Sequence, residues 1–286
     1  MEFIKMHAVG NDYAYFDYEK VKFYNFSRLA VLVSKRRFSV GADGIIIVKR
    51  LSDFSVKMIM YNADGSRGTT CGNGVRCSAF FAKKYLNLSS DEIVVITDAN
   101  QTKVNLSKKD GIPYAKADMG VIKSVNSQII IAKKLQNMGL YVDYRQIFEM
   151  NAGNRHLVFF YPNHSLISLA KGVRQSNLFP DGINIERVYK IENQTDKIKI
   201  YAEIYERGSG KTLSCGSGAC AIFSAFNKFT NKENKQAQII TDGGTLTVEK
   251  IGENTFLSSP VCEVFKGEIL NKQILGEIDE IQPKLL

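Results

Sequence analysis

Two cysteines stand in nearly the same local sequence in the two halves of the chain. Cys71 and Cys215 each begin a C-G-[NS]-G sequence, and each lies just before a stretch whose apolar residues have helical spacing. Each cysteine is therefore predicted at a helix N-terminus. Free backbone N–H groups and the helix dipole stabilise a thiolate there, and they also bind carboxylates. The two segments are thus expected to supply two ionisable sulfurs, each beside an anion-binding loop.

Two such sulfurs could exchange a proton at a single carbon atom. If a substrate carbon lay between them, one sulfur would remove a proton and the other would add one from the opposite face, which inverts the configuration. N–H groups around the substrate carboxylate would stabilise the negative charge that develops. This route needs no pyridoxal phosphate and no metal ion, so we expect no cofactor and no metal site.

The ordinary role of a free cysteine is inert packing. The chain has five cysteines. The repeated glycine context favours a chemical role for Cys71 and Cys215, whereas Cys77, Cys220 and Cys262 are predicted to be packing residues.

The sequence G-S-G-K-T at residues 208–212 resembles the end of a phosphate-binding P-loop. The P-loop pattern requires its first glycine at position 205, and this position is Tyr205. A nucleotide site is therefore not favoured, although a basic nucleotide- or nucleic-acid-binding protein is the alternative from another functional class.

Composition and charge indicate a globular protein. The chain has 286 residues, 44% hydrophobic and 23% charged, with a net charge of +9. The lysines are scattered rather than gathered in a stripe, so we expect no nucleic-acid partner. No secretory segment follows Met1, the cysteine count is odd and the apolar runs are too short for a bilayer. A cytoplasmic location without membrane contact is expected.

The predicted elements are mostly strands, with helices over 27–35, 73–86, 165–170 and 217–229. An order of strands, an acidic residue, a glycine-rich stretch, a cysteine and a helix occurs twice. This repetition predicts two similar halves that meet near residues 112–120.

Several spaced motifs resemble those of the diaminopimelate epimerase family, and they cover nearly the whole chain. They are K-M-H-A-V-G-N-D at 5–12, G-A-D-G at 41–44, N-A-D-G-S at 62–66, C-G-N-G-V-R-C at 71–77, G-N-R-H at 153–156, G-I-N at 182–184, E-R-G at 206–208 and C-G-S-G-A-C at 215–220.

The resemblance implies an α/β (α+β) fold of two pseudo-symmetric domains, each a β-barrel-like sheet around a central helix. The N-terminal domain would span 1–117 and be completed by about 263–286, and the C-terminal domain would span 118–262. The implied activity is cofactor-independent epimerisation of LL-diaminopimelate to meso-diaminopimelate, for lysine and peptidoglycan precursor synthesis, in a homodimer. The alternative is a racemase of another amino acid, independent of pyridoxal phosphate, on the same fold.

The resemblance also implies residue roles. The catalytic residues would be Cys71, Cys215, His156 and Glu206. The carboxylate cradle would comprise Gly72, Asn73, Gly216 and Ser217, and the other substrate-binding residues would be Asn11, Asn62, Asn154, Asn184 and Arg207. A simpler interpretation exists for Asn11, Asn73 and Asn154, because asparagine beside glycine often occupies a turn.

Three basic residues depart from the family pattern. Arg155 stands where the family usually has proline, Lys211 where it usually has glutamate, and Arg67 where it often has glutamate. If these side chains point toward the site, their charge should favour thiolate and carboxylate forms.

Overall fold

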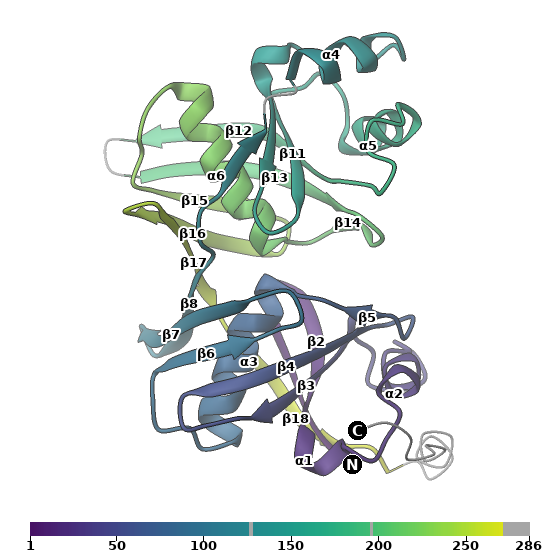
Figure 1. Ribbon diagram of the computed structural model, residues 1–286, viewed down its shortest axis with the longest axis vertical. Helices are drawn as coiled ribbons and strands as arrows, with labels where there is room; N and C mark the ends of the chain where they lie inside the picture. Colours follow the sequence, from purple (N-terminus) through teal and green to yellow (C-terminus); the bar gives the residue numbers. More distant parts are fainter. Residues whose placement is uncertain (126–127, 195–196, 271–286) are drawn as a thin grey trace. The chain divides into compact units, whose positions relative to one another are not determined.

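The computed structural model of the chain describes residues 1–125, 128–194 and 197–270 (Figure 1). They divide into two compact units. The first comprises Met1–Ala117 and the segment that begins at Pro260, and the second comprises Asp118–Ser259. Each unit is a sheet around one long helix, so the predicted mixed α/β fold with a two-fold repeat is confirmed.

The sheet of the first unit has the strand order β18, β1, β2, β3, β4, β6, β7, β8. Neighbouring strands are antiparallel except for the parallel pairs β2–β3 and β4–β6, and the short β5 is added to β4. The strands are β1 (Glu2–Ala8), β2 (Asn11–Asp17), β3 (Gly44–Arg50), β4 (Ser55–Asn62), β5 (Arg67–Gly68), β6 (Glu92–Ile96), β7 (Gln101–Lys109), β8 (Ile112–Asp118) and β18 (Cys262–Glu268).

The sheet of the second unit repeats this arrangement in the order β9, β10, β11, β12, β13, β15, β16, β17. The parallel pairs are now β11–β12 and β13–β15, and β14 is added to β13. The strands are β9 (Lys123–Val125), β10 (Ile147–Asn151), β11 (Arg155–Phe160), β12 (Asn184–Gln194), β13 (Lys197–Glu206), β14 (Gly210–Thr212), β15 (Gln236–Thr241), β16 (Gly244–Ile251) and β17 (Asn254–Pro260).

The first strand of each sheet comes from the chain as it leaves the other unit. β9 follows β8 in sequence and pairs with β10, whereas β18 follows β17 and pairs with β1. The chain therefore crosses between the units twice, and the strand that completes the first unit lies near the end of the described residues.

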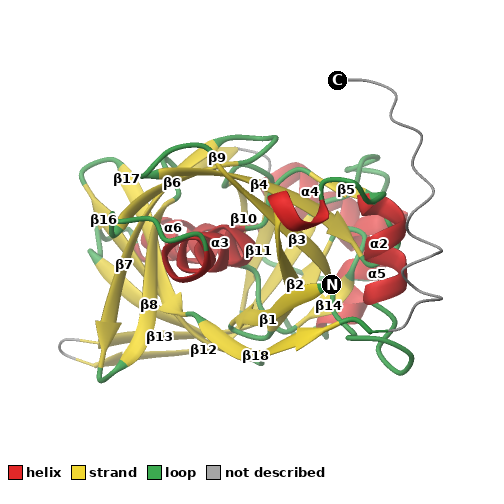
Figure 2. Ribbon diagram, turned by 90° about the horizontal axis from the view of Figure 1, so that it is seen from below, coloured by secondary structure: helices red, strands yellow, loops and turns green. Residues whose placement is uncertain are grey.

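One long helix, with most of its residues buried, lies inside each sheet. These helices are α3 (Gly72–Tyr85) and α6 (Gly216–Thr230), and Figure 2 shows strands around both of them. α3 packs on β1–β4, β6 and β7, and α6 packs on β10–β12, β15 and β16. Burial of both helices by the surrounding strands fixes the place of their N-termini, where Cys71 and Cys215 lie.

Shorter helices cover the outer faces. α2 (Phe26–Val33) packs on β3 and β4, and α5 (Leu166–Gln175) packs on β12 and β13 (Figure 1). The other short helices are α1 (Tyr18–Val21), α4 (Gln128–Gln136) and the 3₁₀ helix η1 (Tyr144–Gln146). Across the described residues, no helix combines the length and the apolar character needed to cross a membrane.

Aromatic packing holds the C-terminal turn of α6 against the sheet. Phe160 on β11 is fully buried, and its ring stacks on Phe229 at a centroid distance of 4.5 Å. We expect Phe160→Ala to lower the free energy of unfolding by about 3–5 kcal/mol, because it removes a large buried side chain and leaves a cavity. Denaturant titration would measure this loss, and Phe38→Ala is the matched control because Phe38 is 84% exposed.

Two local patterns have a clear structural explanation. The G-S-G-K-T sequence forms the β13–β14 hairpin, in which Glu206 pairs with Gly210, so it is not a P-loop. The turn interpretation is wrong for Asn11 and Asn73, whereas Asn154 does lie in the turn between β10 and β11, beside Gly153 with φ +90°. Asn11 begins β2, and Asn73 lies in the first turn of α3.

Candidate active site

Cys71 is the N-cap residue of α3. Its backbone is extended, with φ −150° and ψ 117°, and its Sγ accepts a hydrogen bond from the N–H of Gly74 at 3.4 Å. The thiol donates to Oδ1 of Asn11 at 3.3 Å. The side chain is partly exposed. The predicted helix N-terminus thus holds the sulfur of Cys71 between a backbone donor and an amide acceptor.

Charged residues fix the orientation of Asn11. Its Nδ2 donates to Oδ2 of Asp43 at 3.1 Å, which turns Oδ1 toward Cys71. Arg36 donates to Asp43 at 2.8 Å and also pairs with Asp12. Burial raises the pKa of the Asp43 carboxyl, and the neighbouring Asp12 carboxylate adds to this rise. Asp43 therefore selects the amide orientation that faces the thiol, a contact that the sequence pattern did not suggest.

A buried arginine supports the loop after Cys71. Arg76 is fully buried on α3 and donates to the carbonyl of Gly72 at 3.0 Å and to Oδ1 of Asn73 at 2.6 Å. The side-chain oxygen of Asn73 is therefore used within the loop. An anion at this helix end would be met by backbone N–H groups.

Asn62 ends β4 at a tight turn. Its Nδ2 donates to Oγ of Ser66 at 2.9 Å, and Asp64 accepts from both the N–H and the hydroxyl of Ser66. The structure places Asn62 in the first unit with Asn11 and Cys71. Its predicted contact with a substrate stays a prediction.

Cys215 is the N-cap residue of α6 and repeats the geometry of Cys71. Its backbone has φ −134° and ψ 122°, and its Sγ accepts from the N–H of Gly218 at 3.4 Å. The hydroxyl of Ser217 lies 3.4 Å from the same sulfur. Unlike Cys71, Cys215 is buried.

The pKa of the Cys215 thiol is raised, which corrects the expectation of a lowered value at a helix N-terminus. Burial is the largest cause, and the carboxylates of Glu206 and Glu186 add to it. The hydrogen bonds from Ser217 and Gly218 act in the opposite direction without overcoming the rise. Two nearby carboxylates and a dry environment therefore favour the neutral thiol.

Glu206 lies at the end of β13, close to Cys215. Its Oε1 accepts from the hydroxyl of Thr212 at 2.7 Å. Burial raises the pKa of the Glu206 carboxyl, and hydrogen bonds from Thr212 and Cys215 oppose this rise. The predicted acid and the predicted thiol are thus brought together in the second unit.

We expect Glu206→Gln to lower the pKa of the Cys215 thiol, because it removes a negative charge that disfavours the thiolate. Below the wild-type pKa, each unit of decrease should raise the thiolate fraction, and with it the alkylation rate, about tenfold. Iodoacetamide labelling followed by peptide mass spectrometry would measure the rate at Cys215 across a pH series. Cys71 in the same digest is the internal control. An unchanged or slower rate at Cys215 would contradict the electrostatic account.

His156 on β11 is fully buried and contacts a residue that sequence reasoning missed. Its Nδ1 lies 2.6 Å from Oε1 of Glu186 on β12, and its Nε2 lies 2.8 Å from Oδ1 of Asn154 and 3.1 Å from Oγ of Ser217. Glu186 is fully buried as well. The parallel register that pairs His156 with Asn184 brings this carboxylate to the ring.

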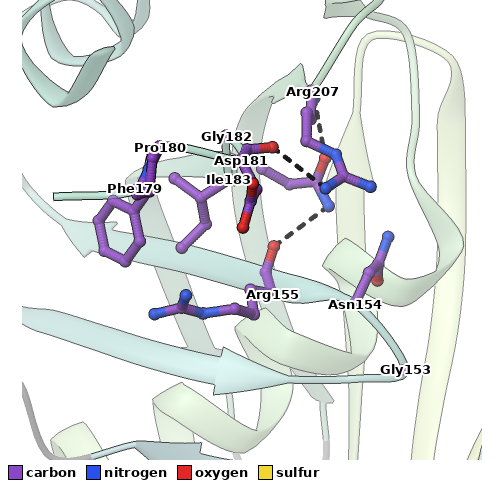
Figure 3. Close-up of a pocket in the computed structure, with 10 residues that line it drawn as sticks. Gly153, Asn154, Arg155, Phe179, Pro180, Asp181, Gly182, Ile183 and Arg207 are labelled. Carbon is purple, nitrogen blue, oxygen red and sulfur yellow. Dashed lines mark hydrogen bonds between the residues drawn. The ribbon is translucent and has the colours of Figure 1, made fainter. Parts of the chain in front are cut away.

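A pocket of about 270 Å³ lies beside these residues in the second unit (Figure 3). Arg207 donates through Nη1 to the carbonyl of Asp181 at 3.1 Å. Asn184 accepts from the N–H of Arg207 at 2.9 Å and donates to the carbonyl of Arg155 at 3.2 Å. The lining residues are Gly153, Asn154, Arg155, Phe179, Pro180, Asp181, Gly182, Ile183, Asn184 and Arg207.

The pocket wall requires a glycine at position 182, where the backbone lies against the side chain of Arg207. Gly182 has φ +77°, and a Cβ atom there would lie 2.8 Å from Cγ of Arg207. A side chain at this position would be strained and would also displace the arginine. The G-I-N sequence is thus explained by two features. Gly182 allows the backbone turn, and the side chain of Asn184 connects the start of β11 to the end of β13 through its two hydrogen bonds.

Each of the three unusual basic residues is paired with an acid. Arg67 donates to Asp98 at 2.7 Å, and Lys211 lies 3.1 Å from Glu203 and 3.3 Å from Asp242. Arg155 donates through Nε to Glu149 at 2.8 Å, and its guanidinium lies 4.8 Å from the ring centre of Phe179. The positive charges that depart from the family pattern are therefore largely balanced where they stand.

Comparison with known sequences agrees with these motifs. A sequence model of the family described as diaminopimelate epimerase matches residues 3–125 and 148–260. The diaminopimelate epimerase of Acetivibrio thermocellus is 31% identical over 280 residues, which cover 94% of this chain and 98% of that protein. The enzyme of Agathobacter rectalis is 32% identical over 290 residues, which cover 94% of this chain and 99% of that protein.

Solved structures share the fold at low sequence identity. A phenazine biosynthesis protein of the PhzF family from Bacillus anthracis has a TM-score of 0.70 and 13% identity, with 95% of this chain and 99% of that chain covered. A hydroxyproline epimerase from Agrobacterium vitis has a TM-score of 0.58 and 11% identity, with 94% of this chain and 90% of that chain covered. These similarities concern the fold alone.

Proposed function

Because the chain belongs to the diaminopimelate epimerase family, we propose that it converts LL-diaminopimelate to meso-diaminopimelate with Cys71 and Cys215 as the two acid/base residues. Members of the family are isomerases. In this proposal the reaction uses no cofactor and serves lysine and peptidoglycan precursor synthesis in the cytoplasm, and the active enzyme is a homodimer.

The observation that carries the proposal is the equivalent setting of the two thiols. In each unit the cysteine is the N-cap of the central helix, and its sulfur accepts from the N–H two residues beyond the first glycine, at 3.4 Å. Each sulfur therefore has backbone donors beside it that could bind the carboxylate of an amino acid. Packing alone does not require this geometry to occur twice.

The reaction would proceed by proton transfer at the α-carbon. One sulfur, as thiolate, takes the α-proton, and backbone N–H groups at the helix ends stabilise the charge that spreads into the carboxylate. The other sulfur, as thiol, gives its proton to the opposite face of the carbon. One C–H bond and one S–H bond break, and one of each forms.

The environments of the two thiols suggest which is the acid. The pKa of Cys215 is raised by burial and by Glu206 and Glu186, so this residue enters the reaction as the neutral thiol. Cys71 lies on a helix that also carries the buried guanidinium of Arg76. We therefore assign the initial acid role to Cys215 and the initial base role to Cys71.

The pocket in the second unit would hold the distal, non-reacting end of the substrate. Diaminopimelate carries a second ammonium and a second carboxylate, and a guanidinium such as that of Arg207 can bind a carboxylate through two N–H groups. Asn154 lines the same pocket. Arg207 and Asn154 would thus select a long substrate with a second charged end, because a short amino acid would leave their polar groups without a partner.

The second candidate is a racemase of another amino acid on this fold. It is kept because the hydroxyproline epimerase from Agrobacterium vitis shares the architecture. The two candidates differ in whether the pocket around Arg207 must be filled by a second charged end.

A substrate panel separates the two candidates. Purified protein, dialysed against a chelator, is incubated with LL-diaminopimelate, L-glutamate, L-proline or trans-4-hydroxy-L-proline, and the stereoisomers are separated by chiral chromatography. We expect conversion of diaminopimelate alone. Conversion of another amino acid without diaminopimelate would replace the proposal by the racemase.

A further inference from the structure

Glu186 is a buried carboxylate whose contact with His156 has no part in the proposed reaction. It lies on β12 and is fully buried. Its Oε1 contacts Nδ1 of His156 at 2.6 Å, whereas its Oε2 is buried without a hydrogen-bond partner in the part of the chain that the structure describes. A buried carboxylate oxygen without a partner is unfavourable for folding. Its presence beside the candidate site therefore points to a role in the chemistry.

The contacts of the His156 ring define where its protons lie. Nε2 lies 2.8 Å from the side-chain oxygen of Asn154, and an amide oxygen only accepts hydrogen bonds. In this amide orientation the contact is a hydrogen bond only when Nε2 carries a proton. Nδ1 faces the carboxylate of Glu186, so a second proton lies between these two atoms. The proton on Nδ1 is held in place by its hydrogen bond to Glu186, whereas the proton on Nε2 can be transferred to another group.

A continuous path joins this second proton to the buried thiol. The hydroxyl oxygen of Ser217 lies 3.1 Å from Nε2 of His156 and 3.4 Å from Sγ of Cys215. A hydroxyl can accept one proton while it donates another. No other group needs to move for a proton to pass from the ring to the sulfur.

A glycine provides the space for this arrangement. A Cβ atom at Gly218 would lie 2.7 Å from Oε1 of Glu186. The second glycine of the C-G-S-G sequence therefore lets the carboxylate lie against the helix end that carries Cys215. The other carboxylate near Cys215 is Glu206 on β13, which Thr212 holds.

We propose that Glu186 is a positioning residue that holds His156 as a proton store, from which the Cys215 thiolate is re-protonated through Ser217 after each turnover. This inference rests on the proposed function, because that reaction leaves Cys215 as a thiolate. A catalyst that acts repeatedly in one direction must restore its thiol.

The proton balance of the step is complete. The hydroxyl proton of Ser217 passes to Sγ of Cys215, and the proton on Nε2 of His156 passes to the oxygen of Ser217. The neutral ring keeps the proton on Nδ1, and this N–H group donates a hydrogen bond to the carboxylate of Glu186. Nε2 then takes a proton from water, and Cys71 returns to water the proton that it removed from the substrate.

Glu186→Gln tests the proposal because glutamine keeps the shape and removes the carboxylate. We expect kcat for diaminopimelate to fall about tenfold or more and KM to stay within about twofold, since substrate contacts are untouched. The matched control is Glu203→Gln in the same unit, which removes a carboxylate that pairs with Arg187 and Lys211. This control should keep the wild-type kcat.

The nitrogen resonances of the His156 ring provide a readout that a merely structural role would not move. The chain has three histidines, so the signal is assigned by comparison with single substitutions at His7 and His164. From the contacts of the ring we expect a proton on both ring nitrogens of the wild type and on Nε2 alone in Glu186→Gln, because the glutamine amide donates to Nδ1.

Two results would overturn the proposal: a wild-type ring without a proton on Nδ1, or a Glu186→Gln protein with wild-type kcat and ring spectrum. If the variant does not fold, the wild-type spectrum still decides. The ring spectra need no substrate. If neither wild type nor control epimerises diaminopimelate, the proposed function fails, and the spectra separately decide whether Glu186 holds the ring proton.

Discussion

Cys71→Ala and Cys215→Ala should each lower kcat for diaminopimelate by about 10²-fold to 10⁴-fold, the range for loss of a general acid or base. Each substitution removes one of the two groups that must act on opposite faces of the α-carbon. The double variant should be little worse than either single one, because residues that act as a unit do not contribute additively. Chiral chromatography of the product measures all three rates.

Cys262→Ala is the control for the cysteine variants. Cys262 is an exposed free thiol at the start of β18 and caps neither of the two central helices. This variant should keep wild-type turnover and should also exclude thiol loss as a general cause of inactivation. Retention of most activity in either Cys71→Ala or Cys215→Ala would show that the reaction does not need two thiols.

Arg207→Lys should lower kcat/KM for diaminopimelate by about 10-fold to 100-fold, mainly through a higher KM. Lysine keeps the charge but lacks the planar pair of N–H donors that matches a carboxylate. In the structure, the aliphatic part of the Arg207 side chain lies over Gly182 and its guanidinium donates to the carbonyl of Asp181, so its position at the pocket is fixed. Initial-rate kinetics over a range of substrate concentrations would separate KM from kcat.

Arg174→Lys is the matched control for Arg207→Lys. Arg174 lies exposed in the last turn of α5 and does not line the pocket. Its substitution should leave both kinetic constants unchanged. A wild-type KM in Arg207→Lys would show that the pocket does not bind the substrate. The roles of the two cysteines would still be tested by their own variants.

The repeated motifs in the sequence were sufficient to predict the two central helices and the cysteines that cap them. C-G-[NS]-G is a local signal, since N-capping depends on residues within one helical turn. The hairpin at G-S-G-K-T was not predicted, although Gly208 and Gly210, both with positive φ, supply the backbone freedom that it needs. α4 escaped prediction because its run of isoleucines lacks a clear periodicity: Ile129 and Ile130 are exposed, whereas Ile131 is buried.

The electrostatics of the site could not be predicted from the sequence. The raised pKa of Cys215 depends on burial and on Glu186 and Glu206, which strands distant in sequence bring to the helix end. Glu186 itself occupies an ordinary position in a strand, two residues after Asn184. Its contact with His156 depends on the parallel pairing of β11 with β12, and no local sequence pattern specifies that register.

The unusual basic residues show the same limit. Arg67, Arg155 and Lys211 could be identified as extra charges, but their partners Asp98, Glu149 and Glu203 are known only from the fold. Balanced pairs of this kind have much weaker effects on a neighbouring thiol than isolated charges.

Proton exchange in D₂O tests the central claim most directly. The reduced, chelator-dialysed protein is incubated with LL-diaminopimelate in D₂O, and the α-protons of substrate and product are followed by NMR. Two thiols on opposite faces predict that, early in the reaction, meso-diaminopimelate carries deuterium at the inverted carbon while the remaining LL-isomer stays protonated. Equal early deuteration of the remaining substrate and the product would indicate a single base and contradict the account.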